Sequence, residues 1–212
     1  MNNNVKPKWK FVGGQLCLDF INSVDGRIEQ RVKNTIVSTI RKDKLESYED
    51  LVDWGKTIGV LKEATAKNLI HIASQKGKIT DQVFERAIIL RESLFRILKH
   101  IIENREPSEE DMEILNSECV VAREWQKLVY SSNKFSWNFE SVDDEPDCMI
   151  WQIALSGAEF LLSDQLHRVR QCPGENCGWL FLDTSKNDSR QWCDMKDCGN
   201  LAKVRRYRER QR

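Results

Sequence analysis

The spacing of apolar residues predicts a chain built mainly from helices. The clearest stretch begins after Thr80, where apolar side chains recur at every third or fourth position over about five turns. These residues are Val83, Ala87, Leu90, Leu94, Ile97 and Ile101. Such a stripe is typical of an amphipathic helix with one buried face, so we expect this helix to lie at the centre of the body.

Capping residues and glycines indicate further helices on both sides of it. Ser47 is typical of an N-cap, Gly59 of a helix end, and Ser108 after Pro107 of another helix start. Apolar residues accompany each of these signals. Together with the long central helix, helices are predicted at residues 13–24, 47–59, 62–75, 107–128 and 147–163.

Residues 134–140 break the helical pattern, because polar and aromatic side chains alternate strictly along them. Alternation with a period of two predicts a short strand with one buried face. The polar stretch from Asp25 to Glu46 has no clear periodicity, so no element is predicted there. We therefore expect a mainly α-helical body with at most one small hairpin.

Four cysteines near the end of the chain form two pairs with equal internal spacing. Cys172 and Cys177 are separated by four residues, as are Cys193 and Cys198, and fifteen residues lie between the pairs. This spacing is typical of structural zinc sites, and four thiolates close a tetrahedral coordination sphere. We expect one structural Zn²⁺ and no catalytic metal.

The residues around these cysteines predict a small finger that resembles a treble clef. A strand is expected at 179–182, a turn at 184–189, a return strand at 190–192, and a helix directly after Cys198. Asn200 suits the cap of that helix. Its apolar residues, Leu201, Val204 and Tyr207, are expected to face the zinc knuckle.

Cysteine usage and the lack of long apolar runs favour a reducing compartment. Of the seven cysteines, Cys17, Cys119 and Cys148 stand singly in apolar surroundings, as buried free thiols do. No apolar run reaches the ~20 residues that span a bilayer, and the N-terminus lacks the apolar segment of a secretory signal. We expect a cytoplasmic protein without a membrane partner.

The net charge of zero conceals a basic end on an acidic body. Residues 166–212 hold 11 Lys and Arg against 6 Asp and Glu, a net charge of +5, which leaves a net charge of −5 on the rest. A basic helix attached to a metal-fixed knuckle favours a polyanion partner. Its candidate nucleic-acid contacts are Lys203, Arg205, Arg206, Arg208 and Arg210.

With these motifs in place, the chain resembles the ABATE-domain family, whose members end in a CGNR-type zinc finger. The matching stretches are GGQLCLDFINSVDGR (13–27), DLVDWG (50–55), AIILRESLFRIL (87–98) and the run from Cys172 to the C-terminus. The resemblance implies a helical ABATE-like domain at 1–165 and a four-cysteine finger at 166–212. It also implies a stress-related transcription regulator with a DNA-binding finger.

One position of the finger departs from the family pattern. The CGN element is present at Cys198, Gly199 and Asn200, but Leu201 stands where the family name has arginine. If that arginine normally contacts nucleic acid, this chain lacks one contact.

Three polar residues stand within apolar segments of the body, namely Asp19, Asn22 and Arg91. Buried polar groups need hydrogen-bond partners. These residues therefore form either a structural network that fixes helix packing or a pocket for a small effector, such as an anionic metabolite held by Arg91.

These observations favour a DNA-binding transcriptional regulator whose zinc-held helix neutralises phosphates, with base contacts from Lys203 and Arg206. Because one short helix gives little affinity, we expect a homodimer to favour specific regulation. Two alternatives stay open: an RNA- or ribosome-associated zinc protein that stacks bases on Trp179, Phe181 and Trp192, and a protein–protein adaptor. An enzyme is not favoured, because the sequence has no phosphate loop, GxSxG or HExxH motif.

Overall fold

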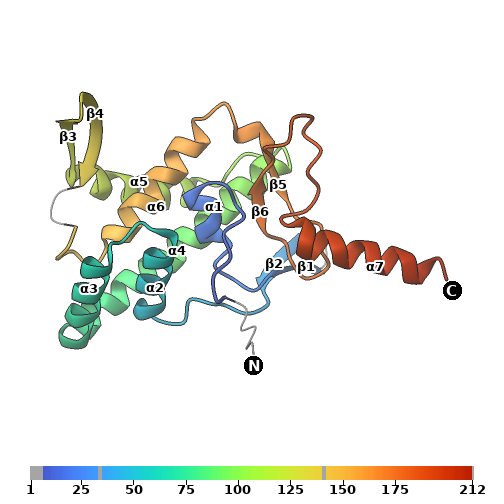
Figure 1. The fold of residues 1–212 in the computed structure, drawn as a ribbon, viewed down its shortest axis with the longest axis horizontal. Helices are drawn as coiled ribbons and strands as arrows, with labels where there is room; N and C mark the ends of the chain where they lie inside the picture. The colour runs from blue at the N-terminus through green and yellow to red at the C-terminus, as the bar shows by residue number, and fades with distance from the viewer. Residues whose placement is uncertain (1–6, 33–34, 140–141, 212) are drawn as a thin grey trace.

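The computed structural model describes residues 7–32, 35–139 and 142–211, and shows a helical body that continues into a small C-terminal finger (Figure 1). Helix α4, Gly77–Ile102, runs through the centre of the body, as its apolar stripe predicts. The other helices of the body contact α4 or each other. They are α1 (Leu16–Ile21), α2 (Tyr48–Ile58), α3 (Glu63–Gln75), α5 (Glu109–Glu124) and α6 (Cys148–Leu161).

The predicted capping residues hold the helix ends. The Ser47 side chain accepts a hydrogen bond from the Asp50 amide at 3.4 Å, and the Ser108 side chain accepts one from the Asp111 amide at 3.2 Å. Gly59 ends α2 with a left-handed φ of 89°, a conformation that glycine adopts at little cost. Both start signals and the stop signal are therefore confirmed.

Two β-hairpins depart from the predicted body. Strands β1 (Arg27–Val32) and β2 (Thr35–Ile40) pair antiparallel within a stretch where no element was predicted. Helix α5 ends at Glu124, and the residues expected to continue it form β3 (Gln126–Ser131), which pairs with β4 (Lys134–Phe139).

The expectation that one face of the strand at 134–140 is buried is wrong for the residues described. Phe135 and Trp137 on β4 are exposed, as are Leu128 and Tyr130 opposite them on β3. Alternation along the chain specifies which side chains share a face of the hairpin, but it does not specify whether that face is covered.

The finger has the predicted helix but a different hairpin. After a short 3₁₀ helix (Leu166–Arg168), β5 (Val169–Gln171) pairs antiparallel with β6 (Leu180–Leu182). The predicted return strand at 190–192 is wrong, because the partner of β6 precedes the first cysteine pair. A π-helical turn, Met195–Gly199, leads directly into α7 (Asn200–Glu209), so Cys198 lies in the first turn of a continuous helix. The mainly α fold with a small four-cysteine finger is confirmed.

The finger and the helical body share one apolar core. Val169, Leu180 and Leu182 of the finger pack in the same cluster as Leu18 and Leu94 of the body. A second cluster contains Val24 of the body, Trp179 and Phe181 of the finger, and two of the zinc-site cysteines. The predicted boundary between residues 165 and 166 thus divides segments that pack together. Within the described ranges, no helix is long and apolar enough to cross a bilayer.

Candidate metal centre and basic helix

The four predicted ligands converge on one point. The Sγ atoms of Cys172, Cys177, Cys193 and Cys198 all lie within 4.8 Å of one another. The Sγ atoms of Cys177 and Cys193 are 3.5 Å apart, and those of Cys193 and Cys198 are 3.7 Å apart. A tetrahedral zinc with Zn–S bonds of about 2.3 Å requires sulfur atoms about 3.8 Å apart. The chain therefore has one structural zinc site, closed by four thiolates.

Deprotonation of all four thiols requires a cation at the centre of the site. Hydrogen bonds from Cys177 and Cys193 lower the pKa of Cys172, whereas the same contacts raise the pKa of Cys177 and Cys193 because the two thiols stand beside a thiolate. Four neighbouring thiolates cannot form at neutral pH unless positive charge compensates them. A divalent ion at their centre supplies that charge.

Local backbone geometry brings the ligands together. The Cys177 amide donates to the Gly174 carbonyl at 2.9 Å, which closes the knuckle between the first two ligands. A Cβ atom on Gly174 would lie 3.1 Å from the Cys198 Sγ, so a side chain there would crowd the sulfur atoms. Before the second pair's helix, the Asp194 side chain accepts from the Lys196 amide at 2.7 Å and caps the first turn. Asn200, the predicted cap, instead lies inside this continuous helix, where its side-chain amide donates to the Lys196 carbonyl at 3.0 Å.

Arg190 fastens the second cysteine pair to the rest of the molecule. Its guanidinium donates to main-chain carbonyls of Val12, Leu182, Trp192 and Cys193, and it lies 4.5 Å from the centre of the Phe181 ring. All of these acceptors are backbone atoms, so Arg190 positions the zinc ligand Cys193 and is not directed at an external anion.

Residues 22–27, near the start of the chain, form the surface that contacts the finger. The Asn22 side chain donates to the Leu180 carbonyl at 2.7 Å and accepts from the Leu180 amide at 3.0 Å, as a partner strand would. The Arg27 amide donates to the Cys177 carbonyl at 2.9 Å. A Cβ atom on Gly26 would lie 2.0 Å from the Asn176 carbonyl oxygen, so only glycine allows this approach.

Helix α7 extends away from the body and has no buried residue (Figure 1). The candidate contacts Lys203, Arg205, Arg206, Arg208 and Arg210 are all exposed. Arg205 forms an ion pair with Glu175 of the first knuckle. Within the described part of the chain, the other four form no ion pair and therefore point their charge at solvent.

The expectation that Leu201, Val204 and Tyr207 face the zinc knuckle is wrong, since all three are exposed. The short π-helical turn directs α7 outward, so its apolar side has nothing among the described residues to pack against. The zinc knuckle is instead packed by Trp179 and Phe181, which are both buried.

The three candidate effector residues all have partners within the protein. Asp19 accepts hydrogen bonds from the Val12 and Gly13 amides at 2.8 and 2.7 Å, and burial raises its pKa in spite of these bonds. Asn22 holds β6, as described above. Of the three, Asp19 alone is among the residues that line a cleft of about 710 Å³ between residues 11–19 and 189–195.

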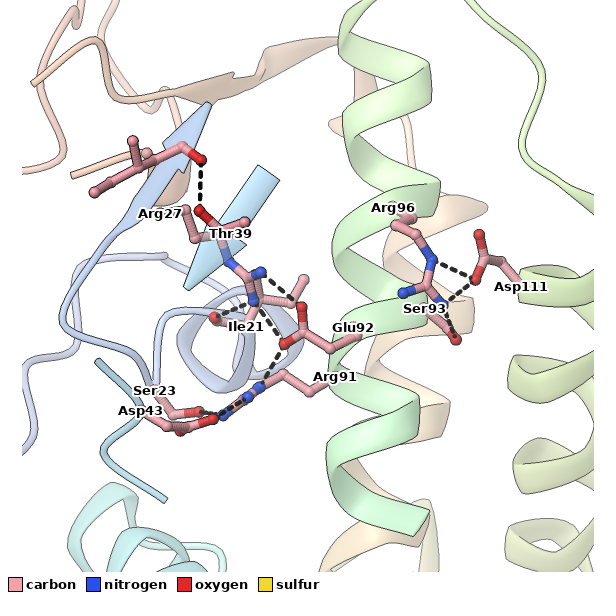
Figure 2. A network of polar contacts seen from close by, with 12 residues as sticks. Ile21, Ser23, Arg27, Thr39, Asp43, Arg91, Glu92, Ser93, Arg96 and Asp111 are labelled. Atoms are coloured by element: carbon pink, nitrogen blue, oxygen red, sulfur yellow. Dashed lines mark hydrogen bonds and ion pairs between the residues drawn. The ribbon is translucent and has the colours of Figure 1, made fainter. Parts of the chain in front are cut away.

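Arg91 lies fully buried at the centre of an ionic network (Figure 2). Its guanidinium makes a two-pronged pair with Asp43 at 2.8 and 2.5 Å and donates to Glu92 at 2.9 Å. Glu92 in turn accepts from Arg27 at 2.7 and 2.9 Å. This arrangement supports the structural interpretation, because the donors of Arg91 that would hold an anion already have carboxylate partners.

Sequence reasoning did not single out Arg190, Glu175 or Gly26. The acceptor of Arg190 on Val12 is 178 positions away along the chain, and no local pattern reports such a contact. The one available signal was the position of Gly26 between polar residues, which is typical of a turn but does not reveal the second backbone that approaches it.

Two family profiles match the chain. The ABATE family, described as "Putative stress-induced transcription regulator", matches residues 14–164, and the CGNR zinc finger matches residues 168–211. No curated protein sequence matches the chain significantly.

Proposed function

We propose that this chain, which belongs to the ABATE family, is a DNA-binding transcriptional regulator in which a structural zinc holds α7 against duplex DNA. The observation that carries the proposal is α7 itself. It is a zinc-anchored helix that projects from the body with every side chain accessible and with four basic residues that have no ion-pair partner among the described residues. A helix that only stabilised the fold would bury one face.

The charges of α7 are arranged for contact from one side. Lys203, Arg206 and Arg210 recur at three- and four-residue spacing and so share one face. This face can neutralise phosphates and steer the protein to DNA, and Lys203 and Arg206, besides neutralising phosphates, make limited contact with base edges in this proposal. The ten residues of α7 span about 15 Å, which suits a major groove.

The zinc has a positioning role in this proposal. When bound, it holds four thiolates together and adds no open coordination position, so the proposal includes no catalytic step. Cys198 in the first helical turn, Arg190 on the Cys193 carbonyl and Glu175 on Arg205 then set the direction in which α7 leaves the knuckle.

The alternative of RNA stacking on the finger finds less support. Trp179 and Phe181 are buried, and the indole Nε1 of Trp179 donates to the Val24 carbonyl at 3.0 Å. Base stacking requires an accessible ring face. Of the three aromatic residues that this alternative used, Trp192 alone is partly exposed.

The decisive test is the salt dependence of duplex binding by the zinc-loaded chain. For Lys203→Ala/Arg206→Ala, we expect weaker binding and a slope of log K against log salt that is shallower by about 2, because each lost phosphate contact contributes about 0.9. The matched control, Lys56→Ala/Lys67→Ala, removes two exposed lysines from the body and should bind as the wild type does.

Three results would contradict the proposal. They are a flat salt dependence of the wild type, equal binding by the α7 variant, and a preference for single-stranded RNA over duplex DNA. Selection of bound sequences from random duplexes would then test whether Lys203 and Arg206 read bases.

A further inference from the structure

The β3–β4 hairpin carries a second exposed surface that the proposed DNA contact does not use. Cross-strand pairs Leu128–Trp137 and Tyr130–Phe135 place four large apolar side chains on one face. Their exposed fractions are 56% for Leu128, 61% for Tyr130, 71% for Phe135 and 57% for Trp137. These four residues are called the hairpin face below. The hairpin lies at the opposite end of the molecule from α7 (Figure 1).

The hairpin face continues a row of aromatic rings that begins in the core. Trp151 is fully buried and stacks on Trp125 with ring centres 4.8 Å apart, and Phe139 at the root of the hairpin lies 5.8 Å from Trp151. Phe139, Trp137 and Phe135 then follow on the same side of β4, and the Phe135 ring lies 4.9 Å from Tyr130. The core thus extends along the hairpin into solvent.

Exposure of this apolar face to water is unfavourable in a monomer. A two-stranded hairpin is marginally stable in water unless its apolar face is packed, and within the described residues this one is packed only near its root. Contact with another molecule would therefore stabilise the hairpin.

The area of the hairpin face matches the apolar part of a standard dimer interface. At the exposures given above, its three aromatic rings present roughly 400 Å² of accessible surface, and Leu128 adds to it. A standard interface buries about 800 Å² on each partner, of which about 65% is apolar in homodimers, or roughly 500 Å².

The charges around the hairpin face favour a second copy over nucleic acid. Among the described residues of the two strands, none that is charged shares this face, because Lys127 and Lys134 lie on the other side. Two copies can therefore pack face to face without apposing like charges.

We propose that the hairpin face is a homodimer interface, in which Leu128, Tyr130, Phe135 and Trp137 of two copies pack against each other about a two-fold axis. The contact is isologous, so the same four residues contribute from each copy. Aromatic side chains of this kind are the usual energetic centre of protein interfaces.

The test is sedimentation of the full zinc-loaded chain over a dilution series, in reductant and without nucleic acid. We expect a reversible dimer whose dissociation constant rises roughly a hundredfold in Phe135→Thr/Trp137→Thr, since two central aromatic residues are lost. The matched control, Ile79→Gln/Leu162→Gln, removes two exposed apolar residues elsewhere and should leave the constant unchanged.

Hydrogen exchange of residues 126–139 supplies a second measurement that needs no variant. Protection of these amides should rise with protein concentration in the wild type. Zinc content and helical circular dichroism confirm that each variant folds.

A wild type that stays monomeric, or a hairpin variant that dimerises as the wild type does, overturns the proposal. The proposal is also overturned by a hairpin variant that still dimerises as the wild type does but no longer binds a single-stranded oligonucleotide. The face would then be a base-stacking surface. None of these outcomes depends on whether α7 binds DNA.

Discussion

Glu92 is the residue on which two buried arginines depend. It accepts from Arg27 and from Arg91, whose guanidinium groups are almost entirely removed from water. The Arg27 guanidinium carbon also lies 3.9 Å from the centre of the Phe95 ring, so this ring shields the guanidinium from solvent on that side. Burial opposes the ionisation of Glu92, but hydrogen bonds and charge from the two arginines outweigh it and lower its pKa below 4.5.

This pKa gives the stability of the fold a defined dependence on acid. Because the folded pKa is depressed, the stabilisation is present above pH 4.5 and is lost as pH falls through the folded pKa. At neutral pH, Glu92→Gln should lower the free energy of unfolding by about 2–3 kcal/mol, since it leaves buried charges without their partner. The difference from wild type should shrink below pH 4.5, where the carboxyl of the unfolded wild type takes up a proton, and should be lost as pH falls through the depressed pKa of the folded protein.

Urea unfolding of the wild type and of Glu92→Gln along a pH series measures this difference. Zinc loss in acid affects both proteins equally, because both have the same zinc site, so it does not contribute to the difference. Glu85→Gln, an exposed change on the same helix, serves as the control and should stay within about 0.5 kcal/mol of wild type. A difference that is constant down to low pH would show that Glu92 acts through packing alone.

At the scale of the element, the orientation of α7 relative to the first knuckle depends on an ion pair between Glu175 and Arg205. Glu175 pairs with Arg205, while Lys203, Arg206, Arg208 and Arg210 stay accessible. The pair is solvent-exposed on both sides and thus contributes little to stability. Its larger effect is on the charge that the finger can offer a polyanion.

Glu175→Gln should therefore tighten duplex binding several-fold at low salt and steepen the salt slope by up to about 1, because Arg205 becomes free for a phosphate. Titrations across a salt series measure both quantities. Glu63→Gln removes an equally exposed carboxylate from α3 and should have no effect. Weaker binding by Glu175→Gln would instead mean that the pair is needed to aim α7.

Sequence patterns predicted those elements whose signals are local. The stripe of α4, the caps at Ser47 and Ser108, and all four zinc ligands depend on neighbours a few positions apart. The β1–β2 hairpin was missed because its two strands are mostly polar, and their few apolar residues, Ile28, Val32, Ile36, Val37 and Ile40, do not alternate clearly along the sequence. Likewise, three-residue β5 is too short for any periodicity.

The sequence could not show whether an apolar face is covered by another part of the molecule. The apolar residues of α7 and of β4 have the spacing of buried faces, and both faces are open to solvent. The same limit applies to Asn22 and Arg91, which were recognisable as polar groups needing partners. Their partners, Leu180 and Asp43, come from distant segments that only the folded chain brings near.

At the scale of the whole molecule, zinc stabilises more than the finger. Strand β6 contributes Leu180 and Leu182 to the main core, and its ends are fixed by Cys177 and by the Leu182 amide on the Gly13 carbonyl. Loss of the metal therefore loosens a strand on which the body packs.

Removal of zinc, by a chelator or by Cys193→Ser/Cys198→Ser, should lower the thermal midpoint of the entire chain by about 10 °C, given a loss of about 3 kcal/mol. Near-ultraviolet circular dichroism, followed together with zinc content, reports the buried Trp54 and Trp151 of the body. Cys119→Ser, a thiol outside the cluster, is the control. An unchanged body transition after complete zinc loss would show that the finger folds independently.

The docking of the finger on residues 12–27 limits how its parts can be exchanged. Gly26 leaves no room for a different knuckle backbone, and Asn22 bonds to both main-chain groups of one residue in β6. A hybrid that joins the finger of one relative to the body of another would need to carry the matching N-terminal segment with it. The segment that must be exchanged together with the finger is therefore discontinuous in the chain, since residues 12–27 and the finger are separated by the other helices of the body.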